Sequence, residues 1–541
     1  MKRRNLLVTL AGLPAAASLP LSGAASRTTG RELDNPYAEV DWDTWECLHS
    51  MSHQHQGQTD ASRNGFLEMG YRHLAFSNYY PSAPTYPLPA DYLAKHPDVI
   101  AAPNAEHHSF PDAGLHFNAL GSLLATGYGS SVSAKECAIS PIVHRFEKLE
   151  IFNTERPWLG VYRLDVRLSA SEGKPTARLT VEGAHECGFR EGFSDKGPIL
   201  ERELPPGNHT LYLRTTAASI ETKLVFDTAA LSVTQYRLMQ GANRPWRDVF
   251  RAALDGEMID GKRSGGLLHG EGGGLTLNHP TGKLADYAPM LDFDPRVLGI
   301  EVWNQLTSGF GSSRGFYDHS GEPNLHFYQL WDDILRTGRR CWGFFVKDHN
   351  TFGRGRNVLL VPKLSALPPA EREAAALCAY RKGAFFGSVA SLAASENAEV
   401  VTPYDRSDLR FSRIITHDDK LQVTVAGNDP AKRPNVQIRF VTDQGIASIV
   451  DSAEAEFPLK RDASGQLVAQ FVRVEAFAYP ETHLQGEPLT AEKLRGMNVH
   501  DISLLHDQKA LRGPAFASTD PALRTPIPIV DMIFSQPLRR V

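Results

Sequence analysis

Two parts of this chain alternate short apolar runs with helix-like segments, and a strand-rich stretch separates them. Runs such as YRHLAFS, GGLTLNHP and CWGFFVKDHN end in polar residues, which is typical of parallel strands covered by helices. Between the two parts, segments such as GVYRLDVRLSA alternate apolar and polar residues between Gly/Pro turns, which predicts an antiparallel β-sandwich. The pattern as a whole predicts an α/β body at 40–130 and 243–394, an inserted β-sandwich at 135–238 and a C-terminal β-rich domain at 396–541.

The length and charge of the chain narrow the class of protein. Its 541 residues exceed the size at which a single hydrophobic core stops growing, so several domains are expected. Its net charge of -5 provides no basic field that could hold nucleic-acid backbones. We therefore expect a multi-domain globular protein without general nucleic-acid binding.

Residues 1–26 have the features of an export signal peptide. MKRRNLLVTLAGLPAAASLPLSGAAS combines a basic head, an apolar stretch and small residues suited to cleavage, and its Arg3-Arg4 pair resembles a twin-arginine signal. The apolar stretch is too short and too often broken by proline for a stable membrane span, and no later segment is apolar for long enough. We expect an exported protein, periplasmic or extracellular, with no membrane span.

Histidines and carboxylates follow the apolar runs of the α/β parts. His53 and His55 form an H-x-H pair, and residues two apart on a strand face the same side, so both imidazoles can reach one ion. Imidazole and carboxylate ligands together suit Mn, Fe or Zn rather than Ca or Mg alone. We expect one to three divalent transition-metal ions, and the predicted ligands are His53, His55, Glu106, His116, His279, Asp348 and His349.

A series of motifs resembles the polymerase and histidinol phosphatase (PHP) domain. In chain order they are HSMSHQHQG, GYRHLAFSNYYPS, PNAEHHSF, GLHFNALG, GGLTLNHPTG, GIEVWN and WDDILRTGRRCWGFFVKDHNTFG, and they cover the two α/β parts. The resemblance implies a distorted, TIM-like (β/α)7 barrel that carries two or three divalent ions and hydrolyses phosphate esters.

The resemblance also implies a role for each predicted ligand. His53 and His55 would be the ligands of the first motif, Glu106 the bridging carboxylate and His116 the histidine that follows it. His279 would be the ligand of the HP element, and Asp348 with His349 would approximate the final D-x-H pair.

Two positions differ from the family pattern. Ser77-Asn78-Tyr79 stands where the family usually ends a strand in T-D-H, so one histidine ligand is missing. Asp348 and His349 are adjacent, and adjacent residues on a strand face opposite sides. Both can bind one ion only if a bulge or loop turns the chain there.

These motifs predict an exported metal-dependent hydrolase, a phosphoesterase that uses metal-activated hydroxide. The predicted catalytic residues are His53, His55, Glu106, His279 and Asp348, and weaker candidates for substrate binding are Tyr79, Lys347 and Arg354. One alternative is a carbohydrate-active enzyme that cleaves glycosides at a remodelled PHP site. Another is a non-catalytic binding protein with a decayed site. The substrate, whether phosphate ester or carbohydrate, and the oligomeric state stay open.

Overall fold

The structure is a computed structural model of the whole chain, and it describes residues 33–122, 245–391 and 407–541 apart from short gaps. The gaps are 58, 78–85, 87, 108–109, 111, 260–261, 305–308, 312–324, 350–353 and 513–524. Between 131 and 239 it describes strands alone. The predicted export signal, residues 1–26, lies outside the described residues. In the described part of the chain, no helix has the length and apolar character needed to cross a membrane.

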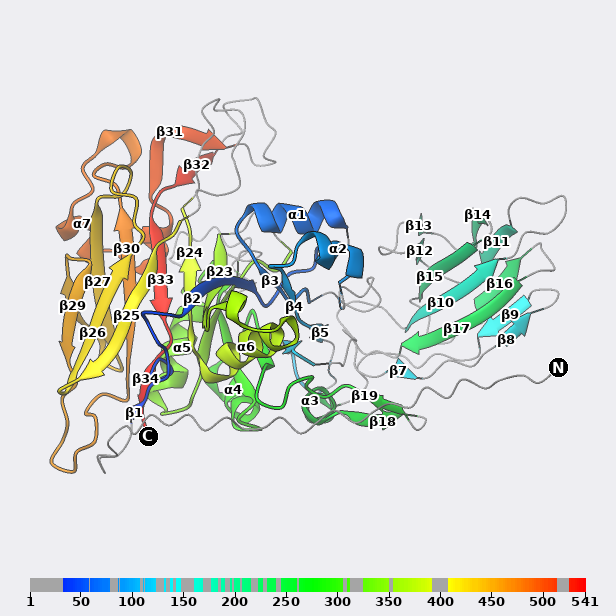
Figure 1. Ribbon diagram of the computed structural model, residues 1–541, viewed down its shortest axis with the longest axis horizontal. Helices are drawn as coiled ribbons and strands as arrows, with labels where there is room; N and C mark the ends of the chain where they lie inside the picture. Colours follow the sequence, from blue (N-terminus) through cyan, green and yellow to red (C-terminus); the bar gives the residue numbers. More distant parts are fainter. Residues whose placement is uncertain are drawn as a thin grey trace.

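Strands and helices alternate in the two α/β parts (Figure 1). The first part contains β2 (Glu46–Met51), α1 (Asp60–Glu68), β3 (His73–Leu74), α2 (Ala90–Lys95), β4 (Ile100–Ala101), β5 (Glu106–His107) and β6 (His116–Leu120). The second contains α3 (Trp246–Asp255), β18 (Glu257–Ile259), β19 (Lys262–Ser264), β20 (Gly274–Asn278), α4 (Leu284–Leu291), β21 (Val297–Asn304), α5 (His326–Arg336), β22 (Trp342–Val346), β23 (Gly355–Val361), α6 (Pro369–Lys382) and β24 (Phe385–Val389).

Local sequence explains where several of these helices begin and end. The Thr59 side chain accepts a hydrogen bond from the backbone N–H of Ser62 and so caps the start of α1. Helix α6 begins with Pro369 in its first turn, where the missing N–H costs nothing. It ends at Lys382 and is followed by Gly383, whose φ of 74° is left-handed and suits glycine just after a helix.

Strands β18 and β19 pair with each other, and the other strands of the α/β parts lie in two sheets. One five-stranded sheet has the order β22-β21-β20-β6-β5, in which β20, β21 and β22 are parallel and β6 is antiparallel to β20. The other sheet contains β24, β23, β2, β3 and β4 in this order, and β2, β3 and β4 are parallel. Strand β21 is buried along its whole length and packs against α4 and α5.

Backbone contacts join the two sheets just beyond β2 and β22. Gln54 and Asp348 form a parallel bridge, and the N–H of Asp348 donates to the carbonyl of His53 at 3.1 Å. Neither sheet closes on itself among the described residues, so the (β/α)7 barrel stays a prediction. The bridge nevertheless brings the ends of strands from both sheets to one place.

Five strands of the C-terminal part continue the second sheet, three form a sheet of their own, and two pair with each other. Its elements are β25 (Arg410–His417), β26 (Lys420–Ala426), β27 (Asn435–Thr442), β28 (Gly445–Val450), β29 (Glu454–Pro458), β30 (Phe471–Tyr479), α7 (Ala491–Arg495), α8 (Val499–Ser503), β31 (His506–Arg512), β32 (Thr525–Pro528), β33 (Asp531–Ser535) and β34 (Leu538–Arg540). Strand β33 pairs with both β24 and β30, so the sheet runs across the boundary that the sequence predicts near residue 396. Strand β34 pairs with β30 and with β1 (Leu33–Asp34), the first strand described.

A buried charge cluster also links the α/β body to the C-terminal strands. The guanidinium of Arg473 on β30 lies 2.8 Å from the Asp332 carboxylate on α5 and also contacts the neighbouring Glu475. The side chains of Arg473 and Glu475 are fully buried, and the hydroxyl of Tyr328 donates to Glu475. These contacts tie helix α5 to strand β30.

The strands described between 131 and 239 pair with one another in two antiparallel sheets, at the right of Figure 1. They are β7 (Ser131–Val132), β8 (Cys137–Ile139), β9 (Val143–Phe146), β10 (Gly160–Leu168), β11 (Ala177–Glu182), β12 (Glu186–Phe189), β13 (Asp195–Lys196), β14 (Ile199–Leu204), β15 (Gly207–Thr215), β16 (Thr222–Phe226) and β17 (Leu231–Met239). Their packing as a sandwich stays a prediction.

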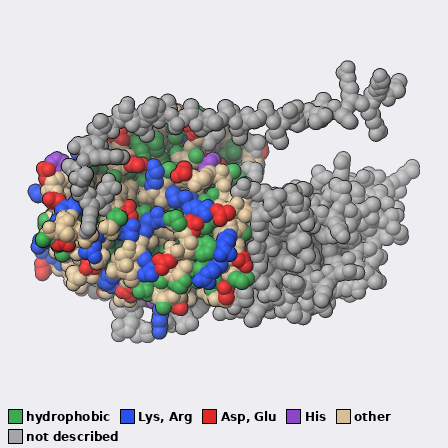
Figure 2. Space-filling view, turned by 90° about the horizontal axis from the view of Figure 1, so that it is seen from below, with side chains coloured by type: hydrophobic (Ala, Val, Ile, Leu, Met, Phe, Trp, Pro, Cys, Tyr) green, Lys and Arg blue, Asp and Glu red, His purple; other side chains and the backbone are tan. Residues whose placement is uncertain are grey.

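The described surface in Figure 2 carries charges of both signs. Lys and Arg side chains are intermixed there with Asp and Glu side chains over the part of this face that is coloured by type. The view therefore shows no large field of a single sign on that part of the face. The expectation that the protein does not bind nucleic acids in general stays a prediction.

Candidate metal centre

The structure brings the predicted ligands together at the ends of strands from both sheets. His53 and His55 follow β2, Glu106 begins β5, His116 begins β6, His279 follows β20, and Asp348 and His349 follow β22. Their ligand atoms form three overlapping groups in which all atoms lie within 4.8 Å of one another. The groups are His53, His55 and Glu106; His55, Asp348 and His349; and Glu106, His116 and His279.

Four of these side chains converge on one point. The Nε2 atoms of His53 and His55 lie 3.0 Å apart. Glu106 Oε2 lies 3.0 Å from His55 Nε2 and 3.5 Å from His53 Nε2. Asp348 Oδ1 lies 3.4 Å from both nitrogens. Two imidazoles and two carboxylates therefore direct one atom each into the same small volume.

The second oxygen of Glu106 contacts a neighbouring group of ligands, His116 and His279. Glu106 Oε1 lies 3.1 Å from His116 Nδ1 and 3.3 Å from His279 Nε2, and it accepts a hydrogen bond of 2.9 Å from the amide of Asn278. Because its two oxygens face different histidine pairs, Glu106 lies between two adjacent sets of ligands. This is the position of a carboxylate that can bridge two ions.

Left-handed backbone at two strand ends makes this convergence possible. His279 has a φ of 23° and Asp348 a φ of 54°, which are unfavourable for residues other than glycine and are often found at functional sites. The turn at Asp348 also allows the adjacent residues Asp348 and His349 to face the same group of ligands. The His349 ring stacks on His55 at 4.1 Å between centroids, and its Nε2 lies 3.5 Å from Asp348 Oδ1.

Three polar residues at the centre were not identified from the sequence. They are Asn278, Glu301 and Asn304, and all three are buried. Glu301 Oε1 lies 2.6 Å from His53 Nδ1, and Asn304 donates to both Glu301 and Asp348. The available signal was a carboxylate inside the otherwise apolar run VLGIEVW, because a fully buried Glu needs a partner.

The carboxylates control the charge of the histidines. Burial disfavours the charged form of His53, but Asp348, Glu301 and Glu106 outweigh it and raise the pKa of His53 well above its ordinary value. Burial also opposes ionisation of Glu106, yet the surrounding histidines, with His53 foremost, lower the pKa of that carboxyl well below its usual range. The centre thus combines ionised carboxylates with basic imidazoles, which is a ligand set suited to a divalent cation.

The hydrogen bonding of two buried carboxylate oxygens bears on whether a metal ion fits at this centre. Glu106 Oε2 and Asp348 Oδ1 are buried and accept no hydrogen bond from the described residues, although both face imidazole nitrogens. Buried carboxylate oxygens normally have a partner, and an ion would supply one. The residues present therefore could hold a metal ion, with the imidazole and carboxylate donors that Zn, Mn and Fe accept.

The weaker substrate-binding candidates lie differently. Lys347 is buried, and its ammonium lies 5.3 Å from the centroid of the Tyr71 ring. The Arg354 guanidinium donates to the carbonyls of Ala390, Ser503 and Val530, so it connects the α/β body to the C-terminal part. Tyr79 lies outside the described residues. A substrate role for these three residues stays a prediction.

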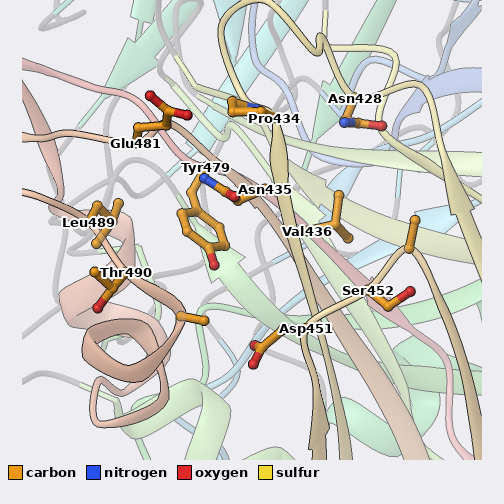
Figure 3. A pocket seen from close by; sticks show the side chains of 12 residues that line it. Asn428, Pro434, Asn435, Val436, Asp451, Ser452, Tyr479, Glu481, Leu489 and Thr490 are labelled. Atoms are coloured by element: carbon orange, nitrogen blue, oxygen red, sulfur yellow. The ribbon is translucent and has the colours of Figure 1, made fainter.

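A separate cavity of about 530 Å³ lies in the C-terminal part (Figure 3). Its walls come from the ends of β27, β28 and β30 and from the start of α7, with the ring of Tyr479 between Asn435 and Thr490. No residue that lines this cavity belongs to the metal centre. This cavity is therefore not part of the ligand cluster.

Comparisons with known proteins leave the family open. No family model matches the sequence, and no curated protein matches it. Among solved structures, DesR, a β-glucosidase from Streptomyces venezuelae in complex with D-glucose, has a TM-score of 0.13 and 10% sequence identity. The alignment covers 80% of this chain and 56% of that chain. A TM-score this low carries no argument about fold or activity.

Proposed function

We propose that this protein is a metal-dependent hydrolase that acts on phosphate esters. The observation that carries the proposal is the position of Glu106, whose two oxygens face two different sets of imidazole ligands. A carboxylate that binds a single ion contacts one set of imidazole ligands, whereas a carboxylate that bridges two ions contacts two sets. The phosphate ester as substrate class rests on the resemblance of the strand-end motifs to the PHP domain.

The residues divide into two ligand sets around Glu106. His53, His55 and Asp348 would hold one ion, and His116 with His279 would hold the other. When bound, a pair of divalent ions lowers the pKa of water and stabilises negative charge on the attacking and leaving oxygens of a phosphoryl group. The fold holds the carboxylates ionised and directs the imidazole nitrogens of each set toward one place. The ligands are therefore arranged before an ion binds.

The exposed fractions of the ligand side chains support an approach of substrate from the side of His116 and His349. The side chains of His53, Glu106 and Asp348 are at most 1% exposed, whereas those of His116 and His349 are 33% and 39% exposed. The partly exposed histidines form the solvent side of the centre. Burial, aided by His55, lowers the pKa of His349 to about 4, so its imidazole is neutral at pH 7, which is the form that binds a metal ion.

The test is a substrate panel with metal-loaded, full-length protein. Chromogenic phosphate monoesters and diesters are assayed beside glycosides, with Mn, Fe or Zn added. We expect turnover of a phosphate ester that is lost in His53→Ala and His279→Ala, because each change removes a ligand. His269→Ala is the matched control, since this half-buried histidine lies outside the three ligand groups.

Two outcomes would contradict the proposal. Turnover of glycosides alone would assign the centre to carbohydrate cleavage, and full activity of both ligand variants would place the chemistry elsewhere. Elemental analysis of untagged protein adds an independent measurement. A preparation that contains no transition metal and takes up none on reconstitution would leave a non-catalytic binding protein as the better account.

A further inference from the structure

Glu301 is a buried carboxylate that belongs to none of the three ligand groups. It lies on β21, a strand buried along its whole length, and its side chain is 1% exposed. Burying an ionised carboxylate is costly unless hydrogen bonds and charge compensate it. The partners of Glu301 therefore show what this residue does in the fold.

Those partners are three parts of the metal centre. Glu301 Oε1 lies 2.6 Å from His53 Nδ1. Glu301 Oε2 accepts a hydrogen bond of 2.6 Å from the backbone N–H of His279 and one of 2.8 Å from the amide of Asn304. The same amide of Asn304 donates to Asp348 Oδ2 at 3.1 Å. One carboxylate thus connects three predicted ligands that follow three different strands.

The contact with His53 determines which ring nitrogen is free. A carboxylate accepts hydrogen bonds, so the proton of a neutral His53 imidazole resides on Nδ1. The lone pair then resides on Nε2, which is the nitrogen that faces His55, Glu106 and Asp348. A carboxylate behind a ligating imidazole both orients the ring and increases its basicity.

The contact with His279 holds a strained backbone. His279 has a φ of 23°, which only a surrounding structure can maintain in a residue other than glycine. Its N–H is directed at Glu301 Oε2, so the carboxylate stabilises the turn that places the His279 ring against Glu106. Glu301 therefore acts on both ligand sets at once.

We propose that Glu301 is a positioning residue that sets the tautomer of His53 and holds the turn at His279, without binding an ion itself. This inference rests on the proposed metal centre. If Glu301 only orients the ligands, its removal should lower the affinity for metal ions and leave the number of bound ions unchanged.

The test compares Glu301→Gln with Glu475→Gln, because both remove the charge of a fully buried carboxylate. Zinc affinity and stoichiometry are measured by calorimetry on the full chain. Nitrogen NMR of the metal-free protein, at a pH high enough to deprotonate His53, reports the tautomer of its neutral ring. We expect Glu301→Gln to weaken zinc binding about 10–100-fold at unchanged stoichiometry and to reduce the Nδ1-protonated form. We expect Glu475→Gln to lower stability and leave zinc affinity unchanged.

The outcomes separate this inference from the proposed function. Wild-type protein that binds no zinc would contradict the metal centre itself. If the wild type binds zinc and Glu301→Gln has the same affinity and the same tautomer, the positioning role alone is overturned. Loss of an entire ion equivalent in Glu301→Gln would also overturn it, because Glu301 would then be a ligand. If Glu301→Gln does not fold, Glu301→Asp retains the charge on a shorter side chain, and wild-type affinity in that variant would overturn the role.

Discussion

Replacing Glu106 with Gln tests whether one carboxylate serves both ligand sets. Its oxygens lie 3.0 to 3.5 Å from imidazole nitrogens of both sets, so its charge would act on each ion at close range. Two unit charges about 4 Å apart interact by about 4 kcal/mol at an effective dielectric constant of about 20. We take this as the minimum loss for a divalent ion, which corresponds to roughly 1,000-fold weaker binding at each position.

Calorimetric titration of metal-free protein with zinc measures this loss, and elemental analysis after dialysis gives the number of ions retained. We expect Glu106→Gln to retain less than one equivalent, while circular dichroism confirms that it is folded. Glu475→Gln controls for removal of a buried carboxylate outside the centre. Wild-type affinity at both positions in Glu106→Gln would refute the bridging role, and weakening of only one ion would refute the sharing of Glu106 by two sets.

Three further predictions concern single side chains. Asp348→Asn should weaken binding of the ion held with His53 and leave the other ion bound, so elemental analysis should show partial loss of metal. Loss of both ions would contradict two separable ligand sets. Arg473→Met should cost about 3–5 kcal/mol in urea unfolding, because it leaves buried carboxylates unpaired, and a change below about 1 kcal/mol would contradict this. Burial raises the pKa of Glu373 to about 7, so the folded protein binds a proton that the unfolded chain has lost, and stability falls as pH rises from about 4.5 to 7. Glu373→Gln should therefore be about 1–3 kcal/mol more stable than wild type at pH 8 and not below pH 4, and an equal gain at both pH values would contradict the raised pKa.

The sequence contained enough information to find the side chains that cluster at the strand ends, but not the residues that contact them from behind. His53, Glu106, His279 and Asp348 each follow or begin a strand, and a polar residue at the end of an apolar run is visible in the sequence. Glu301 lies inside such a run, where the sequence reads as continuous core. Its role depends on which atoms from other strands lie nearby, and sequence spacing does not contain that information.

The division of the chain into domains shows a similar limit. The alternating pattern of the domain predicted at 396–541 predicts strands, and strands are found in the described part of this range. Their pairing with β24 of the α/β body depends on contacts such as Val389 with Met532, which are far apart in the sequence. Alternation reveals that one face of a strand is buried, but it does not reveal which strand lies beside it.

The pairing of the first described strand with the last has a consequence for biosynthesis. Leu33 is paired with Arg540, and Asp34 with Arg539, whose guanidinium also contacts the Asp34 carboxylate. The edges of β24 and β30 are covered by β33 and β34, so they stay unpaired until residues 531–540 have left the ribosome. We therefore expect the sheet that contains β2 to become complete only after residue 540 has emerged from the ribosome.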